Sequence, residues 1–439
     1  MFRYKTKEEL FRKCRELGVS IPYAEDYSVL RAPLTVCGKT VPNRIAIQPM
    51  EGCDGTPSGS PDEHTIARYE RFANSGAGLI WFEATAITED GRANPRQLAI
   101  REDNWEDFRR LTDHIREITR QKFGYEPILI LQATHSGRYA KPTGVPAPII
   151  AYNNPIFEGD KPIDKSRIIT DDALRALEEG YSTAAVLARK AGFDGIDVKC
   201  CHRYLCSELL SAYERPGDYG GSFENRTRFL RNSFRNAREA VPADFIVTSR
   251  MNLYDGFPYP YGFGVSPEGG TKPELSETVK LVGLLKEMGL GLLDATIGNP
   301  YFNPHVNRPA DWQPYELTED PLVGVERMLN CIRTVQTAYP DLTIIGSGTT
   351  YMREYQPNVC AGAIENGYYG IAGWGRQAFA YPGMIEAILL GEAFDPKKCC
   401  ITCGGCTKLM RLGTIAGCAV RDPFYAKLLR EKQMEAKGK

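Results

Sequence analysis

The chain has 439 residues, of which 42% are hydrophobic and 25% charged, and its formal net charge is −1. This composition is that of a globular protein with a large core, and the near-neutral charge argues against a nucleic-acid partner, which favours a basic face. No apolar run approaches the roughly 18 residues that suggest a membrane-spanning helix, and the charged N-terminus lacks the apolar core of a signal peptide. We therefore expect a cytoplasmic protein whose partners include neither nucleic acid nor membrane.

Short β-rich runs alternate with helical patterns along most of the chain, after a short helix predicted over residues 5–18. The predicted strands span 44–48, 79–84, 128–132, 195–199, 245–250, 291–296, 342–346 and 369–373. Helical patterns lie between most of them, at 64–73, 107–120, 171–190, 276–288, 322–339 and 353–366. Eight strands interleaved with helices favour an α/β fold, a closed (β/α)8 TIM barrel. We expect a helical extension over 1–29, the barrel over 30–392 and a cysteine-rich segment over 393–439.

Polar side chains gather at the ends of these predicted strands. The first strand ends in Gln48-Pro49-Met50-Glu51, the third reaches Gln132, and the fifth reaches Arg250. The fourth is followed by Lys199, His202 and Tyr204 within six positions. Such groups are costly to bury unless they are paired or used, and the active site of a barrel of this kind lies at the C-terminal strand ends.

Small-residue turns follow the seventh and eighth strands, where barrels often bind phosphate. Gly348 and Thr349 belong to the first turn, and Gly375 and Arg376 to the second. Either turn alone is typical of a tight chain reversal. Together, with an arginine and helix N-termini behind them, they favour a phosphate-bearing cofactor, because backbone amides can approach an anion where side chains do not obstruct them.

Five of the thirteen cysteines lie in the last 41 residues. Cys400, Cys403, Cys406 and Cys418 form a C-x2-C-x2-C-x11-C pattern, and four thiolates grouped in this way are the usual ligands of a [4Fe–4S] cluster. Cys399 offers a second registration, C-x3-C-x2-C, and the sequence does not choose between the two. Zinc is the main alternative, since four cysteines with similar spacings also bind a single zinc ion.

Several segments in order resemble the Old Yellow Enzyme family of FMN-dependent NADH:flavin oxidoreductases. They are NRIAIQPM, YERFANSGAGLI, LQATHSGR, HRYLCSELLSA, DYGGSFENRTRF and the GSG and GWGR turns, over roughly residues 30–390. With its cysteine-rich tail, the chain is most similar to the 2,4-dienoyl-CoA reductase-like branch, which carries an iron–sulfur cluster. The family fold is a (β/α)8 barrel.

The resemblance implies a set of flavin contacts. Gln132 and Arg250 would contact the pyrimidine edge of FMN, where a cation stabilises the anionic reduced flavin. The FMN phosphate would lie against the turns after strands seven and eight. The expected cofactor-binding residues are Pro49, Met50, Glu51, Ala84, Gln132, Arg250, Gly348, Thr349, Gly375 and Arg376.

The resemblance also implies roles for the residues after the fourth strand. His202 and the position of Lys199 would hold a substrate carbonyl, and two donors there stabilise charge that develops on its oxygen. Tyr204 would protonate the α-carbon after hydride reaches the β-carbon of an α,β-unsaturated carbonyl compound. Lys199 stands where the family usually has histidine, so it either donates to the carbonyl or pairs with Glu51.

The resemblance leaves the electron supply and two alternatives open. The longer relatives carry a C-terminal FAD/NAD(P)-binding domain that this sequence lacks, so we expect electrons from a separate partner protein or from NAD(P)H directly. Oxidation of an amine, aided by an aromatic cage for a cation, is one alternative to ene-reduction, and the candidates for that cage are Tyr213, Tyr301, Phe302 and Trp374. A non-catalytic, zinc-stabilised barrel subunit is another, and an oligomer is compatible with every reading.

Overall fold

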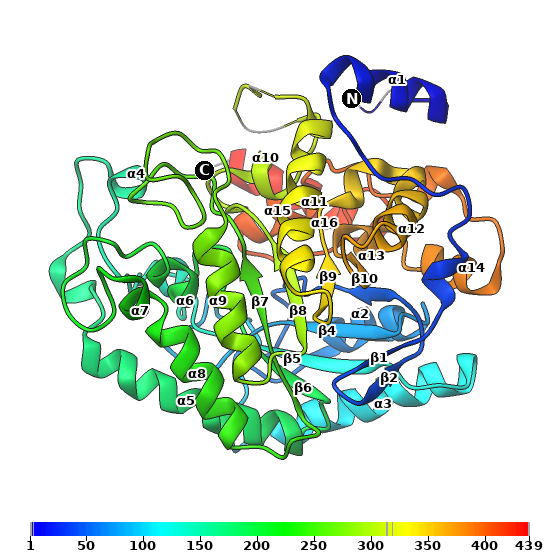
Figure 1. Cartoon of the computed structure of the whole chain (residues 1–439). Helices are drawn as coiled ribbons and strands as arrows, with labels where there is room; N and C mark the ends of the chain where they lie inside the picture. The colour runs from blue at the N-terminus through cyan, green and yellow to red at the C-terminus, as the bar shows by residue number, and fades with distance from the viewer. Residues whose placement is uncertain (1, 3, 313–314, 318, 438–439) are drawn as a thin grey trace.

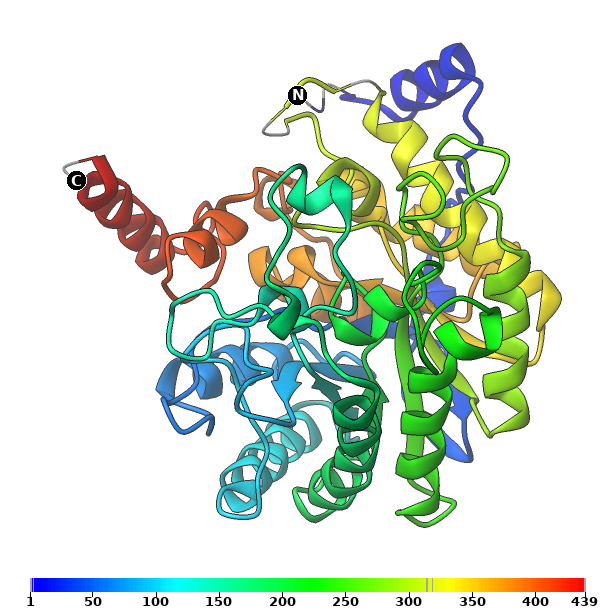
Figure 2. The ribbon, with the colours of Figure 1, turned by 90° about the vertical axis from the view of Figure 1, so that its left-hand side faces the viewer.

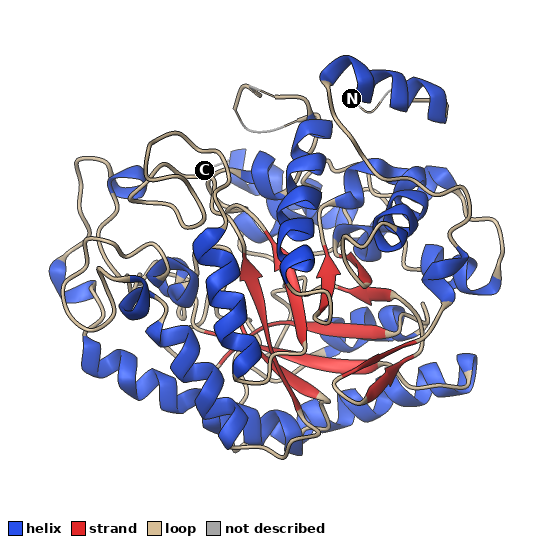
Figure 3. Cartoon of the chain, in the orientation of Figure 1, coloured by secondary structure: helices blue, strands red, loops and turns tan. Residues whose placement is uncertain are grey.

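A closed barrel of eight parallel strands forms the centre of the protein (Figures 1 and 3). This computed structural model describes residues 2, 4–312, 315–317 and 319–437, so the outermost residues of the predicted 1–29 and 393–439 segments lie outside the described part. The predicted (β/α)8 fold is confirmed. In order around the barrel, the strands are β10 (Ile371–Trp374), β3 (Ile45–Ile47), β4 (Leu79–Ala86), β5 (Ile128–Thr134), β6 (Gly195–Val198), β7 (Ile246–Asn252), β8 (Leu292–Thr296) and β9 (Thr343–Gly346).

A helix follows each barrel strand and covers its outer side, as βαβ crossovers require. These helices are α2 (Glu63–Ala73), α3 (Trp105–Phe123), α5 (Asp171–Lys190), α8 (Arg228–Glu239), α9 (Ser276–Glu287), α11 (Pro321–Ala338), α12 (Gln356–Glu365) and α14 (Gly383–Leu390). The strands between them are buried, and β4 and β5 are buried over their whole length.

Three of these helices differ from the sequence-based expectation. The predicted set contains neither α14, which follows the last strand, nor α8, whose sequence RFLRNSFRNARE has four arginines and only a narrow apolar stripe. The helix predicted over 353–366 is divided, because Arg353 has a positive φ of 51° between the 3-10 helix η4 (Thr349–Tyr355) and α12.

A hairpin lies at the N-terminal end of the barrel and was not predicted. Its strands are β1 (Leu34–Val36) and β2 (Lys39–Val41), which pair antiparallel. Val36 and Val41 share one apolar cluster with Leu79, Ile128 and other residues at the beginnings of the barrel strands. The hairpin therefore closes this end with apolar side chains, and the opposite end is left for polar groups.

The C-terminal strand ends point toward α10 and α15 (Figure 1), while α16 extends away from the barrel (Figure 2). No helix in the described ranges is long and apolar enough to cross a bilayer. The remaining helices are α1 (Lys7–Leu17), α4 (Pro155–Glu158), α6 (Leu205–Leu209), α7 (Phe223–Arg226), α10 (Pro304–Asn307), α13 (Arg376–Ala380), α15 (Gly405–Arg411) and α16 (Pro423–Lys437). Short 3-10 turns are η1 (Ser28–Arg31), η2 (Gly137–Tyr139), η3 (Lys165–Arg167) and η5 (Pro396–Lys398). The domain limits at 29/30 and 392/393 stay a prediction.

Close packing of β10 against its neighbours requires a glycine at position 373. A Cβ there would lie 2.4 Å from the carbonyl oxygen of Gly346 and 2.6 Å from the Gln48 side chain. We expect Gly373→Ala to lower the free energy of unfolding by about 1–3 kcal/mol through overpacking, as measured by urea denaturation. Gly370→Ala is the matched control, because its Cβ would meet nothing closer than 3.5 Å. Equal stability of the two variants would contradict this packing.

Candidate active site

A cavity lies at the C-terminal ends of the strands. It brings together residues that the sequence predicted from four separate strand ends. Residues from the loop after β8 and from the cysteine-rich segment complete its wall. The full lining is Pro49, Met50, Glu51, Gln132, Lys199, His202, Arg250, Tyr301, Arg308, Phe379, Cys406, Thr407 and Met410.

Two buried aspartates, Asp197 and Asp294, bind polar residues that line this cavity. The Gln132 amide donates to Asp197 over 2.7 Å, and the backbone N–H of Arg250 donates to the same carboxylate over 2.6 Å. The Arg250 guanidinium pairs with Asp294 at 3.0 Å. Gln132 and Arg250 are therefore oriented by their neighbours in the barrel, as a preorganised binding surface requires.

Sequence reasoning missed both aspartates, although each lies in a predicted strand. A charged residue inside an otherwise apolar strand was the available signal. Asp197 also accepts from the Trp81 indole over 2.9 Å, and Asp294 accepts from Gln48 over 2.7 Å. Burial raises the pKa of Asp197 to about 7 and that of Asp294 to about 6.

The raised pKa of Asp197 makes stability depend on pH. Between about pH 4 and pH 7 the folded protein holds a proton that the unfolded chain has lost, so the free energy of unfolding falls as pH rises. We expect Asp197→Asn to flatten this dependence by at most about 3 kcal/mol between pH 5 and pH 8, measured by urea unfolding at those two pH values. The exposed Asp244→Asn is the control, and an unchanged pH dependence in Asp197→Asn would contradict the raised pKa.

Lys199 and Tyr204 meet at Glu51. The Tyr204 hydroxyl donates to Glu51 over 2.7 Å, and the Lys199 ammonium lies 3.7 Å from the same carboxylate. Lys199 also lies 3.5 Å from the centre of the Tyr204 ring, and the Tyr301 hydroxyl is 3.2 Å from that of Tyr204. Of the two sequence-based readings of Lys199, the pairing with Glu51 is present, and the lysine still lines the cavity.

Burial and the Glu51 carboxylate determine the protonation of Tyr204 and Lys199. Burial, followed by Glu51, raises the pKa of Tyr204 well above 10, so the phenol keeps its proton at neutral pH. Burial lowers the pKa of Lys199, while Glu51 acts in the opposite direction. Tyr204 itself is not part of the cavity wall, but its two hydroxyl partners, Glu51 and Tyr301, are.

His202 faces the cavity with a buried ring nitrogen that has no partner among the described residues. Its Nε2 makes no hydrogen bond. The backbone at His202 has a φ of 64°, an uncommon conformation for a non-glycine residue that is often found at functional sites. Burial, and then Arg250, Lys199 and Arg308, lower its pKa well below 6.5, so the ring is neutral at pH 7. A neutral imidazole in this place is suited to hydrogen bonding with a ligand.

The other predicted flavin residues lie around the cavity and not in its wall. Ala84 is buried in β4 beside Gln132. Gly348 and Thr349 follow β9, and the φ of Gly348 is 88°. Gly375 lies against Met50, since a Cβ there would be 3.1 Å from the Met50 sulfur. Arg376 lines a second cavity, described below.

The four predicted cluster cysteines lie around one helix: Cys406 belongs to α15, Cys400 and Cys403 precede it, and Cys418 follows it. Burial raises the pKa of Cys400 to about 12 and that of Cys418 above its usual value, and the Cys406 thiol adds to both shifts. Burial, and then Glu354, raise the pKa of Cys399 to about 11, while Arg421 lowers it. No group of three His, Cys, Asp or Glu side chains in the described part is close enough to hold a single metal ion. The donor set, four thiols in one segment, matches the chemistry of an iron–sulfur cluster.

The aromatic cage considered for a cationic amine does not assemble. Of its four candidates only Tyr301 lines the cavity. Trp374 is fully buried in β10, Phe302 packs against Phe157 and Phe257, and Tyr213 packs against Arg226. The cavity is instead lined by Lys199, Arg250 and Arg308, a set of cations that disfavours a positively charged ligand.

The residues present suit FMN. Gln132 and Arg250 offer an amide and a cation at one side of the cavity, Pro49 and Met50 offer an apolar surface, and the unpartnered His202 nitrogen faces the same space. Glycine turns after β9 and β10 provide the small residues that a phosphate needs nearby. A parallel barrel with this arrangement at its strand ends has the site of a flavin-dependent oxidoreductase.

Comparison with known proteins agrees with this class. The pattern that defines the NADH:flavin oxidoreductase / NADH oxidase family matches residues 30–262. The NADPH dehydrogenase of Halalkalibacterium halodurans is 32% identical over 275 residues, which cover 60% of this chain and 71% of that protein. The chain belongs to the NADH:flavin oxidoreductase / NADH oxidase family, and the predicted resemblance to Old Yellow Enzymes is confirmed at that level.

Solved structures share the fold. A 2-naphthoyl-CoA reductase in complex with 2-naphthoyl-CoA superposes with a TM-score of 0.74 at 20% identity, over 92% of this chain and 58% of that one. The Old Yellow Enzyme homologue from Zymomonas mobilis gives a TM-score of 0.63 at 20% identity, over 84% of this chain and 98% of that one. The chain therefore spans little more than half of the longer reductase.

Proposed function

We propose that the protein is an FMN-dependent ene-reductase that reduces an α,β-unsaturated carbonyl compound. The observation that carries the proposal is the placement of Lys199 and His202 in one cavity with Gln132 and Arg250, beside the Tyr204 hydroxyl. When bound, FMN supplies a hydride to the β-carbon of the substrate. All other roles fall to side chains of this chain.

Lys199 and His202 would bind the substrate carbonyl. The unpartnered Nε2 of His202 gains a hydrogen-bond partner when a carbonyl enters, which removes the cost of a buried unsatisfied group. Lys199 adds a charged donor. Two donors at one oxygen stabilise the negative charge that develops there as the double bond is reduced.

Tyr204 would supply the proton to the α-carbon. Its raised pKa keeps the phenol protonated, and an enolate carbon is basic enough to accept that proton. Glu51 orients the hydroxyl through the 2.7 Å hydrogen bond, and Lys199 offsets the charge of the carboxylate. After this transfer, a proton would return to the phenol through Glu51 and Tyr301, the two partners of its hydroxyl.

We expect Tyr204→Phe to lower the rate of enone reduction by about 10²- to 10⁴-fold, the usual contribution of a general acid. The measurement is anaerobic reoxidation of the dithionite-reduced protein by 2-cyclohexenone. Flavin content, from the absorbance of the same sample, reports whether the site remains intact. Tyr139→Phe is the matched control, since it removes a neighbouring hydroxyl that bonds to Asn299. Full activity in Tyr204→Phe would exclude it as the proton donor.

The cysteine-rich segment would hold a [4Fe–4S] cluster through Cys400, Cys403, Cys406 and Cys418. Such a cluster passes single electrons when bound. Cys406 lines the cavity proposed for the flavin, so one of the proposed cluster ligands lies beside the proposed flavin site. Electrons would come from a separate donor protein or from NAD(P)H.

We expect Cys400→Ala to lose most of the iron and Cys399→Ala to keep it, because the predicted C-x2-C-x2-C-x11-C pattern begins at Cys400. The measurement is iron, zinc and flavin content of anaerobically purified protein. Zinc without iron would make the segment a structural zinc site, and iron loss from Cys399→Ala alone would select the other registration.

A further inference from the structure

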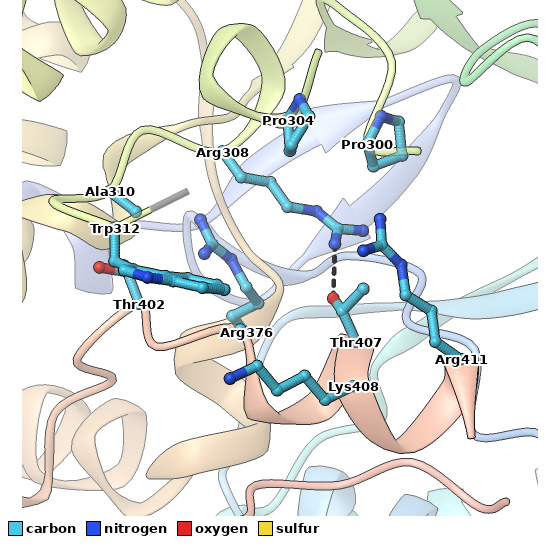
Figure 4. Close-up of a pocket in the computed structure, with 11 residues that line it drawn as sticks. Pro300, Pro304, Arg308, Ala310, Trp312, Arg376, Thr402, Thr407, Lys408 and Arg411 are labelled. Atoms are coloured by element: carbon cyan, nitrogen blue, oxygen red, sulfur yellow. Dashed lines mark hydrogen bonds between the residues drawn. The ribbon is translucent and has the colours of Figure 1, made fainter. Parts of the chain in front are cut away.

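A second cavity opens beside the first and is rich in cations (Figure 4). Arg308, Arg376, Lys408 and Arg411 line it. Arg308 and Arg411 extend toward the same region between Pro300 and α15, as Figure 4 shows. Like charges that converge repel one another unless an anion lies between them.

Acidic side chains are missing from the described wall of this cavity. In the described ranges, Arg376, Lys408 and Arg411 form no ion pair with a carboxylate, although ion pairs are numerous elsewhere on the surface, such as Arg120 with Glu126 at 2.8 Å. Burial, and then repulsion by Arg376, lower the pKa of Arg308. A negative charge brought into this cavity would therefore be stabilised by several cations at once.

The cavity also has an apolar side. Pro300, Pro304 and Trp312 line it, and the Lys408 ammonium lies 4.6 Å from the centre of the Trp312 ring. This contact holds the lysine at the cavity and limits its freedom. A ligand that carries an anionic group on a flat or apolar body would match both parts of the wall.

The two cavities share part of their walls. Arg308 and Thr407 line both, and the Arg308 guanidinium donates to the Thr407 hydroxyl over 2.7 Å. Tyr301, which approaches the Tyr204 hydroxyl, lies in the same loop as Arg308. A molecule whose reacting end lies in the flavin cavity could thus reach the cationic cavity with its other end.

We propose that the cationic cavity binds a carboxylate or phosphate group of the unsaturated substrate, through Arg308, Lys408 and Arg411. This inference rests on the proposed ene-reductase function and names its substrate class, an anionic enone. Arg376 is left to the predicted FMN phosphate site. The two roles are compatible, because the Arg376 guanidinium lies apart from those of Arg308 and Arg411 (Figure 4).

The test compares two probes that differ in one charge, 4-(3-oxobut-1-enyl)benzoate and its methyl ester. Isothermal titration calorimetry measures their dissociation constants with the purified holoprotein, with Lys408→Gln/Arg411→Gln and with a control. The control, Lys427→Gln/Arg430→Gln, removes two exposed charges with the same spacing from α16. We expect the wild type and the control to prefer the benzoate, and the cavity variant to lose that preference by about tenfold or more.

Each contrary result has a distinct meaning. An unchanged preference in the cavity variant overturns the proposal. Loss of flavin from that variant would assign the cations to the FMN phosphate. A higher KM for NADPH but not for NADH would assign them to the reductant. Either result also overturns the proposal. Because calorimetry needs no turnover, failure to reduce both probes would refute the ene-reductase function while leaving a charge-dependent preference as evidence for the anion site.

Discussion

The ion pair between Arg250 and Asp294 is the interaction on which the site depends. Both side chains are buried at the mouth of the barrel, and they lie 3.0 Å apart. Removing one partner of such a pair strands a buried charge, at a cost of about 3–5 kcal/mol. Asp197 binds the backbone of Arg250 and the amide of Gln132, so the same network orients the two groups proposed to meet the flavin.

The cysteine-rich segment completes the site. Cys406, Thr407 and Met410 face the same cavity as the strand ends, although more than 200 residues separate them from Lys199 and His202. The proposed cluster, flavin and anion sites therefore share one helix, α15. A change of its position would alter all three together, which explains why charges on this helix are informative probes of substrate binding.

Local pattern predicted much of this arrangement, and its errors have physical causes. The strand ends were found because polar residues after apolar runs stand out, as Lys199 and His202 do. Helix α8 was missed because four arginines obscure its apolar stripe. The sequence left open whether Cys399 or Cys400 is the first cluster ligand, because the two cysteines are adjacent and either can begin a run of three closely spaced cysteines. The Cys399 side chain is buried and that of Cys400 is partly exposed, and the assignment of the first ligand stays a prediction.

The sequence by itself determined the barrel and the face on which its chemistry lies. Parallel strands alternating with helices bring every C-terminal strand end to one side, so Gln132, Lys199 and Arg250 had to meet there. Only the tertiary structure decided their partners. Tyr204 bonds to Glu51 across 153 positions, and loop residue Arg308 joins the wall beside them. Periodicity specifies elements, but contacts between distant segments depend on loop paths and side-chain packing, which no local pattern encodes.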